Sequence, residues 1–358
     1  MTRGILSASD VPSTTIDGED INTIWEEFQA TLALANEHRS AIAELFTYRT
    51  TLESDLVAQM STEDDFEEAS EFGVPTSLNQ EFEKLRLGFP LRWYDKATRF
   101  TWKFLRDATS EQVRTVHSQA LEADNRLVFR GVMKALLSGT NGVTEQGNTV
   151  YALWNADSVV PPTFGGNTFA GSHTHYLTTN SADIDGEDLK DLITHITHHG
   201  YGTNPGERVI LLANPAQTED IRALRVADGS PFDFIASAGA PAYLTSESLV
   251  GERPPATFEG LKVIGSFGDA WVVEDHFVPA GYVIAVATAG RNSSANPLAF
   301  REHVRPEYSG LRQIPGSDSK YPLAQAYYSR GFGVGVRHRG AAAVMQVTVS
   351  ATYTAPTI

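Results

Sequence analysis

The sequence lacks several features that define common classes of protein. Its 358 residues include no cysteine, which excludes disulfide bonds, thiolate zinc sites and a cysteine nucleophile. No apolar run approaches the roughly 20 residues of a transmembrane helix, so we expect no membrane partner. The first 20 residues do not combine a basic patch with an apolar stretch, and we expect no secretory signal there. The length suffices for about two packed units.

An excess of positive charge is also lacking. The 28 lysines and arginines against 44 aspartates and glutamates give a net charge of −16, which disfavours duplex DNA as an overall ligand. Residues 53–83 contain ten acids and no base, whereas residues 84–106 contain seven bases and one acid. The acidic run is either a solvated face or one half of a charge-complementary surface that meets a second copy of the chain.

Four segments have the spacing of amphipathic helices, namely residues 21–34, 109–138, 186–199 and 217–225. The tetrapeptide Asp-Gly-Glu-Asp occurs at the start of the first and third, at 17–20 and 185–188, and we predict Asp17 and Asp185 as their N-caps. Thr109 and Gln112 fit a capping box at the start of the second helix. At about 1.5 Å per residue, that helix is a rod of roughly 42 Å.

Strands are predicted by apolar runs at residues 208–213, 261–264, 271–274 and 282–286, and by alternation at residues 345–353. Phe100, Trp102 and Phe104 also alternate with other residues, which predicts a half-buried strand. Helices and strands are largely segregated along the chain, so the fold class is α+β. Between two strong helices, residues 47–107 form a connection so long that we expect a functional projection, and its aromatic residues disfavour disorder.

Histidines supply the main candidates for chemistry. His173 and His175 have the spacing of a strand metal pair, but they lie in a Gly/Ser/Thr-rich segment, and we interpret them as surface-loop histidines. His195, His198 and His199 crowd the end of a helix, but the glutamate of a zinc-protease helix is missing. We interpret these three as complementing the helix dipole.

Other short motifs are weaker still. Asp183, Asp185 and Glu187 lack the full calcium-loop pattern, and capping explains Asp185 better. The glycines at 331, 333 and 335 do not open a helix, so we reject a dinucleotide loop. No nucleophile elbow or phosphate-binding Gly-Lys-Ser/Thr loop occurs. We therefore expect no catalytic residue, no cofactor-binding residue, no cofactor and no metal site, and the chain is not expected to be an enzyme.

The order of these elements resembles a known family. The local resemblances are Glu274-Asp-His-Phe-Val-Pro-Ala-Gly-Tyr282 with its following strand, Arg337-His-Arg-Gly-Ala-Ala-Ala-Val-Met345, and the helix, Gly200-Tyr201, strand and Asn214-Pro215 succession. Together they are similar to the major capsid proteins of tailed bacteriophages, which have the Hong Kong 97-like capsid fold. The resemblance covers nearly the whole chain.

The resemblance implies a division of the chain into the parts of that fold. These are an N-terminal arm at 1–46, an extended E-loop at 47–108, a peripheral domain with the spine helix at 109–185, an axial domain at 186–290, and a return to the peripheral domain with the C-terminal strand at 291–358. Some members join subunits through a lysine–asparagine bond. Lys84, Lys96 and Lys103 lie near the loop, but none matches a motif, so no such role is assigned.

The function implied by the resemblance is a major capsid protein. Its copies would self-assemble as hexameric and pentameric capsomers into an icosahedral shell that encloses double-stranded DNA without sequence-specific binding. The expected partners are a separate scaffolding protein, a portal and, optionally, a decoration protein, with assembly in the bacterial host cytoplasm and residence in the virion capsid. Two alternatives stay open: an encapsulin-like compartment shell, and a His-dependent metallohydrolase using His173, His175 and the histidines at 195–199.

Overall fold

The computed structural model describes residues 14–37, 40–58, 68, 73, 84–240, 253–315 and 323–358. The chain divides into two compact units that it enters repeatedly. Unit 1 comprises Met1–Ser40, Leu91–Phe129 and Glu302–Gly333, and unit 2 comprises Ala41–Pro90, Arg130–Arg301 and Val334–Ile358. Within the described residues, no helix has the length and apolar character needed to cross a membrane.

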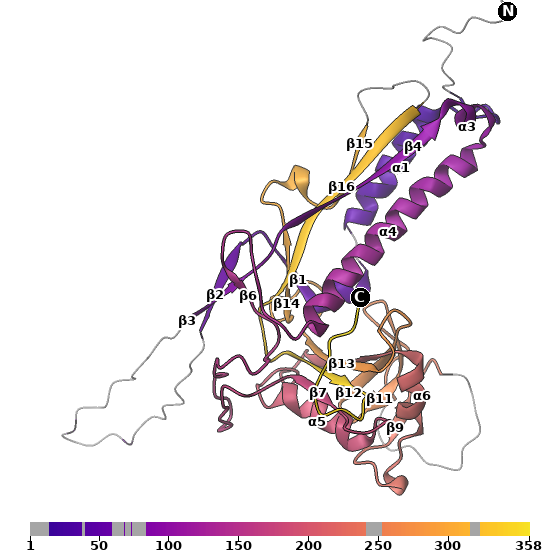
Figure 1. The fold of residues 1–358 in the computed structure, drawn as a ribbon. Helices are drawn as coiled ribbons and strands as arrows, with labels where there is room; N and C mark the ends of the chain where they lie inside the picture. Colours follow the sequence, from indigo (N-terminus) through magenta and orange to yellow (C-terminus); the bar gives the residue numbers. More distant parts are fainter. Residues whose placement is uncertain are drawn as a thin grey trace, which may run out of the picture. The chain divides into compact units, whose positions relative to one another are not determined.

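Unit 1 combines long helices with antiparallel strands (Figure 1). Its elements, some of which continue into unit 2, are α1 (Ile21–Glu37), β4 (Arg92–Thr101), α3 (Trp102–Asp107), α4 (Ser110–Leu137), the 3-10 turn Pro306–Tyr308, β15 (Leu311–Pro315) and β16 (Leu323–Val336). Strand β16 lies between β4 and β15 and pairs with both of them in antiparallel fashion. Helix α4 has 28 residues and confirms the long helix that the sequence predicted.

The core of unit 1 follows from the spacing of apolar residues in α1. Ile24, Phe28 and Leu32 recur every four residues, so they share one face, and all three are buried. Ile24 belongs to a cluster that includes Phe100 at the end of β4. Phe28 and Leu32 belong to a second cluster with Tyr328 of β16. One face of α1 thus covers the sheet along its length.

The N-terminal caps differ in part from the prediction. Thr109 and Gln112 form the expected capping box, with the Gln112 side chain accepting from the Thr109 N–H at 3.0 Å. Asp17 does not cap α1, so that prediction is wrong. Asp20 accepts from the Asn22 N–H at 2.8 Å there, because α1 begins only at Ile21. Asp17 instead accepts from the N–H and the hydroxyl of Ser110 at the start of α4.

Replacing Asp17 by alanine should lower the melting temperature by fraying the first turn of α4. Hydrogen bonds from Thr15 and Ser110 lower the pKa of Asp17 from its ordinary value of 3.8 to about 2. A depressed folded-state pKa stabilises the folded state above pH 3.8, and this contribution is lost as the pH falls through about 2. The melting temperatures of wild type and variant should therefore converge at low pH in a circular dichroism series. A gap that stays constant down to pH 2 would contradict the assignment.

Unit 2 is built around a large mixed sheet. Its elements, listed by label, are α2 (Ala41–Phe46), β1 (Thr47–Thr50), β2 (Ser54–Ala58), β3 (Lys84–Gly88), β5 (Gly142–Val143), β6 (Thr149–Val150), β7 (Tyr176–Thr178), α5 (Gly186–Thr197), β8 (Arg208–Ala213), α6 (Pro215–Ala223), the 3-10 turn Val226–Asp228, β9 (Phe234–Ala236), β10 (Thr257–Phe258), β11 (Leu261–Phe267), β12 (Ala270–Glu274), β13 (Tyr282–Thr288), β14 (Leu298–Glu302) and β17 (Ala342–Gln346).

The sheet has the order β10-β11-β12-β8-β13-β17-β7, with β9 added beside β11 (Figure 1). Strand β8 lies near its centre, parallel to β12 and antiparallel to β13. Five consecutive β8 residues are buried, which explains why this strand reads as a continuous apolar run. Helix α5 packs on β13 and β17 through Leu189, Leu192 and Ile196. Asp185 caps α5 through a capping box with Asp188, as the sequence predicted.

Two predicted strands are too long. The alternation from Phe100 to Phe104 is broken because the Thr101 hydroxyl caps α3 by accepting from the Phe104 N–H at 3.0 Å. The C-terminal strand ends at Gln346 rather than 353. Gln346 pairs with Tyr282, the first residue of β13, and with Thr178, the last residue of β7. Val349, which the alternation places on the same face as the buried Met345, is 75% exposed.

Candidate functional site

Strand β4 leaves much of its length uncovered in unit 1. Its first six residues, 92–97, are all exposed, although side chains alternate between the two faces of a strand. Trp93 and Tyr94 are neighbours on opposite faces, and they are 47% and 37% exposed. A strand with exposed aromatic side chains on both faces is typical of a surface that another chain covers. We call residues 92–97 the β4 surface.

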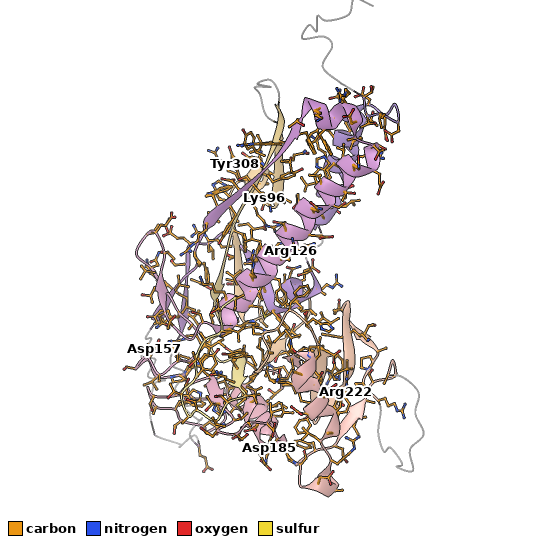
Figure 2. All side chains as sticks on the ribbon, turned by 45° about the vertical axis from the view of Figure 1, so that its right-hand side comes forward. Lys96, Arg126, Asp157, Asp185, Arg222 and Tyr308 are labelled. Carbon is orange, nitrogen blue, oxygen red and sulfur yellow. The ribbon has the colours of Figure 1, made fainter. Side chains whose placement is uncertain are left out.

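Aromatic and basic side chains surround the β4 surface. The Trp93 ring lies over Gly331 of β16, where an added Cβ would stand 2.8 Å from the indole. The same indole lies 5.9 Å from the ring of His303 and 6.3 Å from that of Tyr308. Figure 2 labels Tyr308 and also Lys96, a base within β4 itself. The combination of aromatic rings with bases suits a protein interface.

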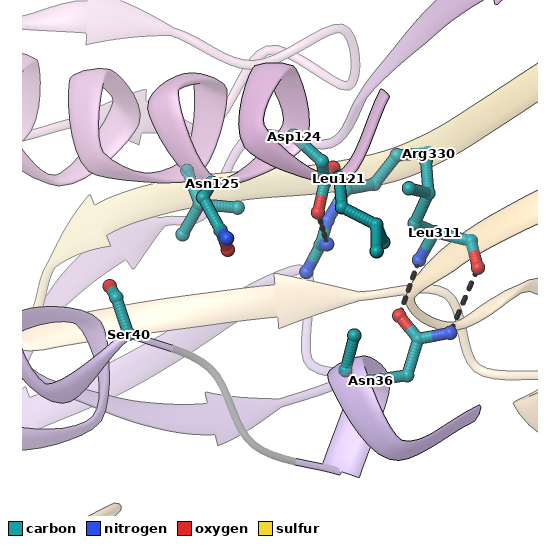
Figure 3. Close-up of a pocket in the computed structure, with 9 residues that line it drawn as sticks. Asn36, Ser40, Leu121, Asp124, Asn125, Leu311 and Arg330 are labelled. Carbon is teal, nitrogen blue, oxygen red and sulfur yellow. Dashed lines mark hydrogen bonds and ion pairs between the residues drawn. The ribbon is translucent and has the colours of Figure 1, made fainter. Parts of the chain in front are cut away.

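A buried ion pair lies between α4 and β16 in unit 1. The Asp124 carboxylate contacts the Arg330 guanidinium, and the two side chains are only 10% and 6% exposed. Burial raises the pKa of Asp124, and the charge of Arg330 opposes that change. Asn36 bridges α1 to β15 nearby, with two 2.8 Å hydrogen bonds to the Leu311 backbone (Figure 3).

Arg339 is a second buried cation, in unit 2. It is 3% exposed, and its guanidinium lies 4.1 Å from the centre of the Trp154 ring and 4.8 Å from that of Tyr151. It donates to the Asp157 carboxylate at 2.8 Å and to the carbonyl of Ala152 at 2.9 Å. Desolvation lowers the pKa of Arg339, and Asp157 opposes this shift. The arginine thus ties the segment after β6 to the β16–β17 connection.

Four histidines of unit 2 come together in space. The candidate ligand nitrogens of His173, His175, His198 and His199 all lie within 4.8 Å of one another. The Nε2 atoms of His173, His175 and His199 form a triangle with sides of 3.1 Å. We call these four residues the histidine cluster. His195, which the sequence grouped with them, is not a member, and its Nδ1 contacts the Asp191 carbonyl at 2.8 Å.

The interpretation of His173 and His175 as surface-loop residues is wrong. His175 is fully buried and His173 is half-buried, because the segment before β7 folds inward against β17. Burial lowers the pKa of His173 and His198 to about 4 and that of His199 to about 2, with weaker contributions from neighbouring histidines. The pKa of His175 is also lowered by burial. All four imidazoles are therefore neutral at ordinary pH.

The sequence joined the two halves of this cluster only in the metallohydrolase alternative, and no spacing pattern showed that they meet. His175 and His198 lie on opposite sides of α5 along the chain, and only the packing of that helix on β17 brings them into contact. The sequence indicates the buried Asp124 more directly. It lies on an apolar face of α4 between Ala120 and Leu127, where a charged residue is unexpected. The glycines at 331, 333 and 335 lie inside β16 rather than before a helix, as expected when the dinucleotide loop was rejected.

Comparison with known proteins defines the fold further. No family model and no curated protein matches the chain. Among solved structures, a chain from Mycobacterium phage Patience is 39% identical over 99% of this chain and 96% of its own length, with a TM-score of 0.75. The capsid of an empty GTA particle is 16% identical over 87% of this chain and 91% of its own length, with a TM-score of 0.53.

These findings define the protein as a structural shell protein with an α+β, Hong Kong 97-like capsid fold. The identity to the Mycobacterium phage Patience chain extends over almost the entire sequence. The chain belongs to the family of tailed-bacteriophage major capsid proteins. Its role is that of a structural protein of the shell.

Proposed function

We propose that copies of this chain assemble as hexamers and pentamers into the icosahedral shell of a bacteriophage virion. The observation that carries this conclusion is the 39% identity to a phage chain across 99% of the sequence. The two chains match over 99% of this chain and 96% of the other, so the similarity is not confined to one part of the fold. Fold similarity to the GTA capsid agrees with it.

The five parts of the family fold are proposed with the ranges given above. The long α4 helix supports a spine in 109–185, and the sheet around β8 supports an axial domain in 186–290. The β2–β3 pair supports the base of an E-loop within 47–108, since its strands enclose the acidic segment. Residues 59–83 of that segment lie outside the described residues except for Glu68 and Gly73, so the contact role of the segment stays a prediction.

The contents and other partners of the shell are also proposals. A net charge of −16 favours double-stranded DNA that is enclosed without being bound tightly, because an acidic surface repels phosphates. A scaffolding protein, a portal and a decoration protein would act with the chain during assembly in the host cytoplasm.

Electron microscopy of the purified full-length protein tests the proposed function directly. Icosahedral shells or capsomer rings are the expected result, and a protein that stays monomeric at high concentration would contradict it. Shells from infected cells should contain nucleic acid. Protein cargo in its place would favour an encapsulin-like compartment.

The β4 surface offers a sharper test, because we propose that a second copy of the chain covers it. Trp93→Asp should abolish shells while leaving the circular dichroism spectrum of the subunit unchanged, since almost half of that side chain is exposed. Trp93→Phe is the matched control and should assemble, because it retains an aromatic ring over Gly331. Normal shells from Trp93→Asp, seen by electron microscopy, would remove the β4 surface from the interface.

A further inference from the structure

The Nε2 triangle of the histidine cluster cannot be satisfied by hydrogen bonds alone. Each of the three nitrogens lies 3.1 Å from the other two. A nitrogen of a neutral imidazole carries either a hydrogen or a lone pair, so it cannot donate and accept at once. Three mutual contacts would need at least one atom to do both. A single cation bound by three lone pairs satisfies all three nitrogens together.

A hydrogen bond fixes which nitrogen of His175 carries the hydrogen. Its Nδ1 lies 2.6 Å from the carbonyl oxygen of Ala342, and a carbonyl only accepts, so Nδ1 carries the hydrogen. In the neutral ring, Nε2 then presents its lone pair to the triangle. Metal-binding histidines commonly donate their other nitrogen to a backbone carbonyl in this way.

His198 supplies an independent observation. Its Nε2 is buried and has no hydrogen-bond partner among the described residues. Buried polar atoms in folded proteins are rarely left without a partner, because their desolvation costs about 1–3 kcal/mol. One ring nitrogen of His198 belongs to the group of four within 4.8 Å. A metal bound to four nitrogens at the centre of the cluster would therefore include His198.

The side chain of Phe169 packs against the histidine cluster. The Phe169 ring stacks on His199 at 4.2 Å and lies 4.9 Å from His173. The backbone fits closely as well, since a Cβ at Gly340 would stand 2.9 Å from the His199 ring. These contacts hold the rings in place without contributing any charge.

We propose that His173, His175, His198 and His199 form a structural binding site for a divalent transition metal, with zinc as the first choice. In a tetrahedral site with Zn–N bonds of about 2.0 Å, the nitrogens are about 3.3 Å apart, close to the triangle here. Imidazoles without a carboxylate suit zinc, copper or nickel better than calcium or magnesium. Four protein ligands leave no open position for a substrate.

The consequence of such a site is a cross-link within unit 2. The residues between β6 and β7 contain little regular structure, and the metal would join their end at His173 and His175 to the end of α5 at His198 and His199. Binding to the folded chain alone stabilises it by mass action. Because the protein has no cysteine, a disulfide bond cannot anchor the long segment between β6 and β7, whereas a bound metal ion can.

The test uses the full-length protein, stripped with EDTA and then dialysed against zinc chloride. We expect about one zinc per chain by mass spectrometric metal analysis, and a melting temperature that rises with zinc. His173→Gln and His198→Asn should reduce bound zinc to background and abolish the rise. His195→Gln is the matched control, because its ring lies 5.7 Å from that of His173 but outside the ligand group, and it should bind zinc normally.

X-ray absorption at the zinc edge of the wild-type protein keeps the proposal testable if a variant fails to fold. Four nitrogen ligands at about 2.0 Å are expected. Background zinc in the loaded wild type, or a shell of oxygen ligands, would overturn the site. Shell formation is read separately by electron microscopy, so failure of the metal site and failure of the capsid function are distinguishable.

Discussion

Replacing Arg339 by methionine should lower the free energy of unfolding by about 3–5 kcal/mol, because removal of one partner leaves a buried charge uncompensated. The uncompensated charge would be that of Asp157, whose side chain is 14% exposed and which pairs with Arg339 at 2.8 Å. Methionine also lacks the guanidinium plane that stacks on Trp154. Urea denaturation of the unassembled chain measures the loss.

Arg222→Met is the control for Arg339→Met. Arg222 also pairs with a carboxylate in unit 2, that of Glu274 at 2.9 Å, but its side chain is 44% exposed (Figure 2). An ion pair this open to solvent contributes no more than about 1 kcal/mol. If the two variants lost equal stability, the buried position of Arg339 would not be the cause.

The elements that the sequence predicted well are those whose signals are local. Strand β8 agrees residue for residue, because a central strand is buried on both faces and reads as one apolar run. Helix α4 agrees because a capping box marks its start and its apolar spacing persists for 28 residues. The α+β class followed from these elements, and their order carried the family resemblance.

The wrong predictions for Asp17 and for the C-terminal strand share a different cause. Each depended on the tertiary contacts of a segment. Asp17 has the same local sequence as Asp185, yet it caps another helix, because Ser110 lies beside it. The C-terminal alternation was real, but a strand ends where its neighbours end, at Gln346. No local pattern contains this information.

Tertiary contacts that no local pattern contains also decided the prediction of the candidate site. His173 and His175 were interpreted as surface residues because glycine, serine and threonine surround them. A polar segment can still be buried where it packs beneath a helix end, and here it meets His198 and His199. The pair spacing is that of the metal site proposed here, but the two histidines that complete the cluster follow α5 in the sequence.

Asp124→Leu should destabilise the chain by about 3–5 kcal/mol, because Arg330 would be left as a buried charge without its carboxylate. Oδ1 of Asp124 has no partner among the described residues, and the adjoining cavity of about 20 Å³ has room for a single water (Figure 3). The cavity therefore offers little solvent to replace the lost carboxylate. Urea denaturation again supplies the measurement.

The double variant Asp124→Leu with Arg330→Met separates charge from packing. If the cost of the single variant is the uncompensated charge, removing both partners should restore most of the lost stability. Glu122 and Arg126 provide the control, because they form an i,i+4 pair on the same helix with side chains 68% and 55% exposed. Glu122→Leu should cost no more than about 0.5 kcal/mol. A double variant as unstable as Asp124→Leu would show that the pair acts through its shape, since its charges would then be absent and the loss would remain.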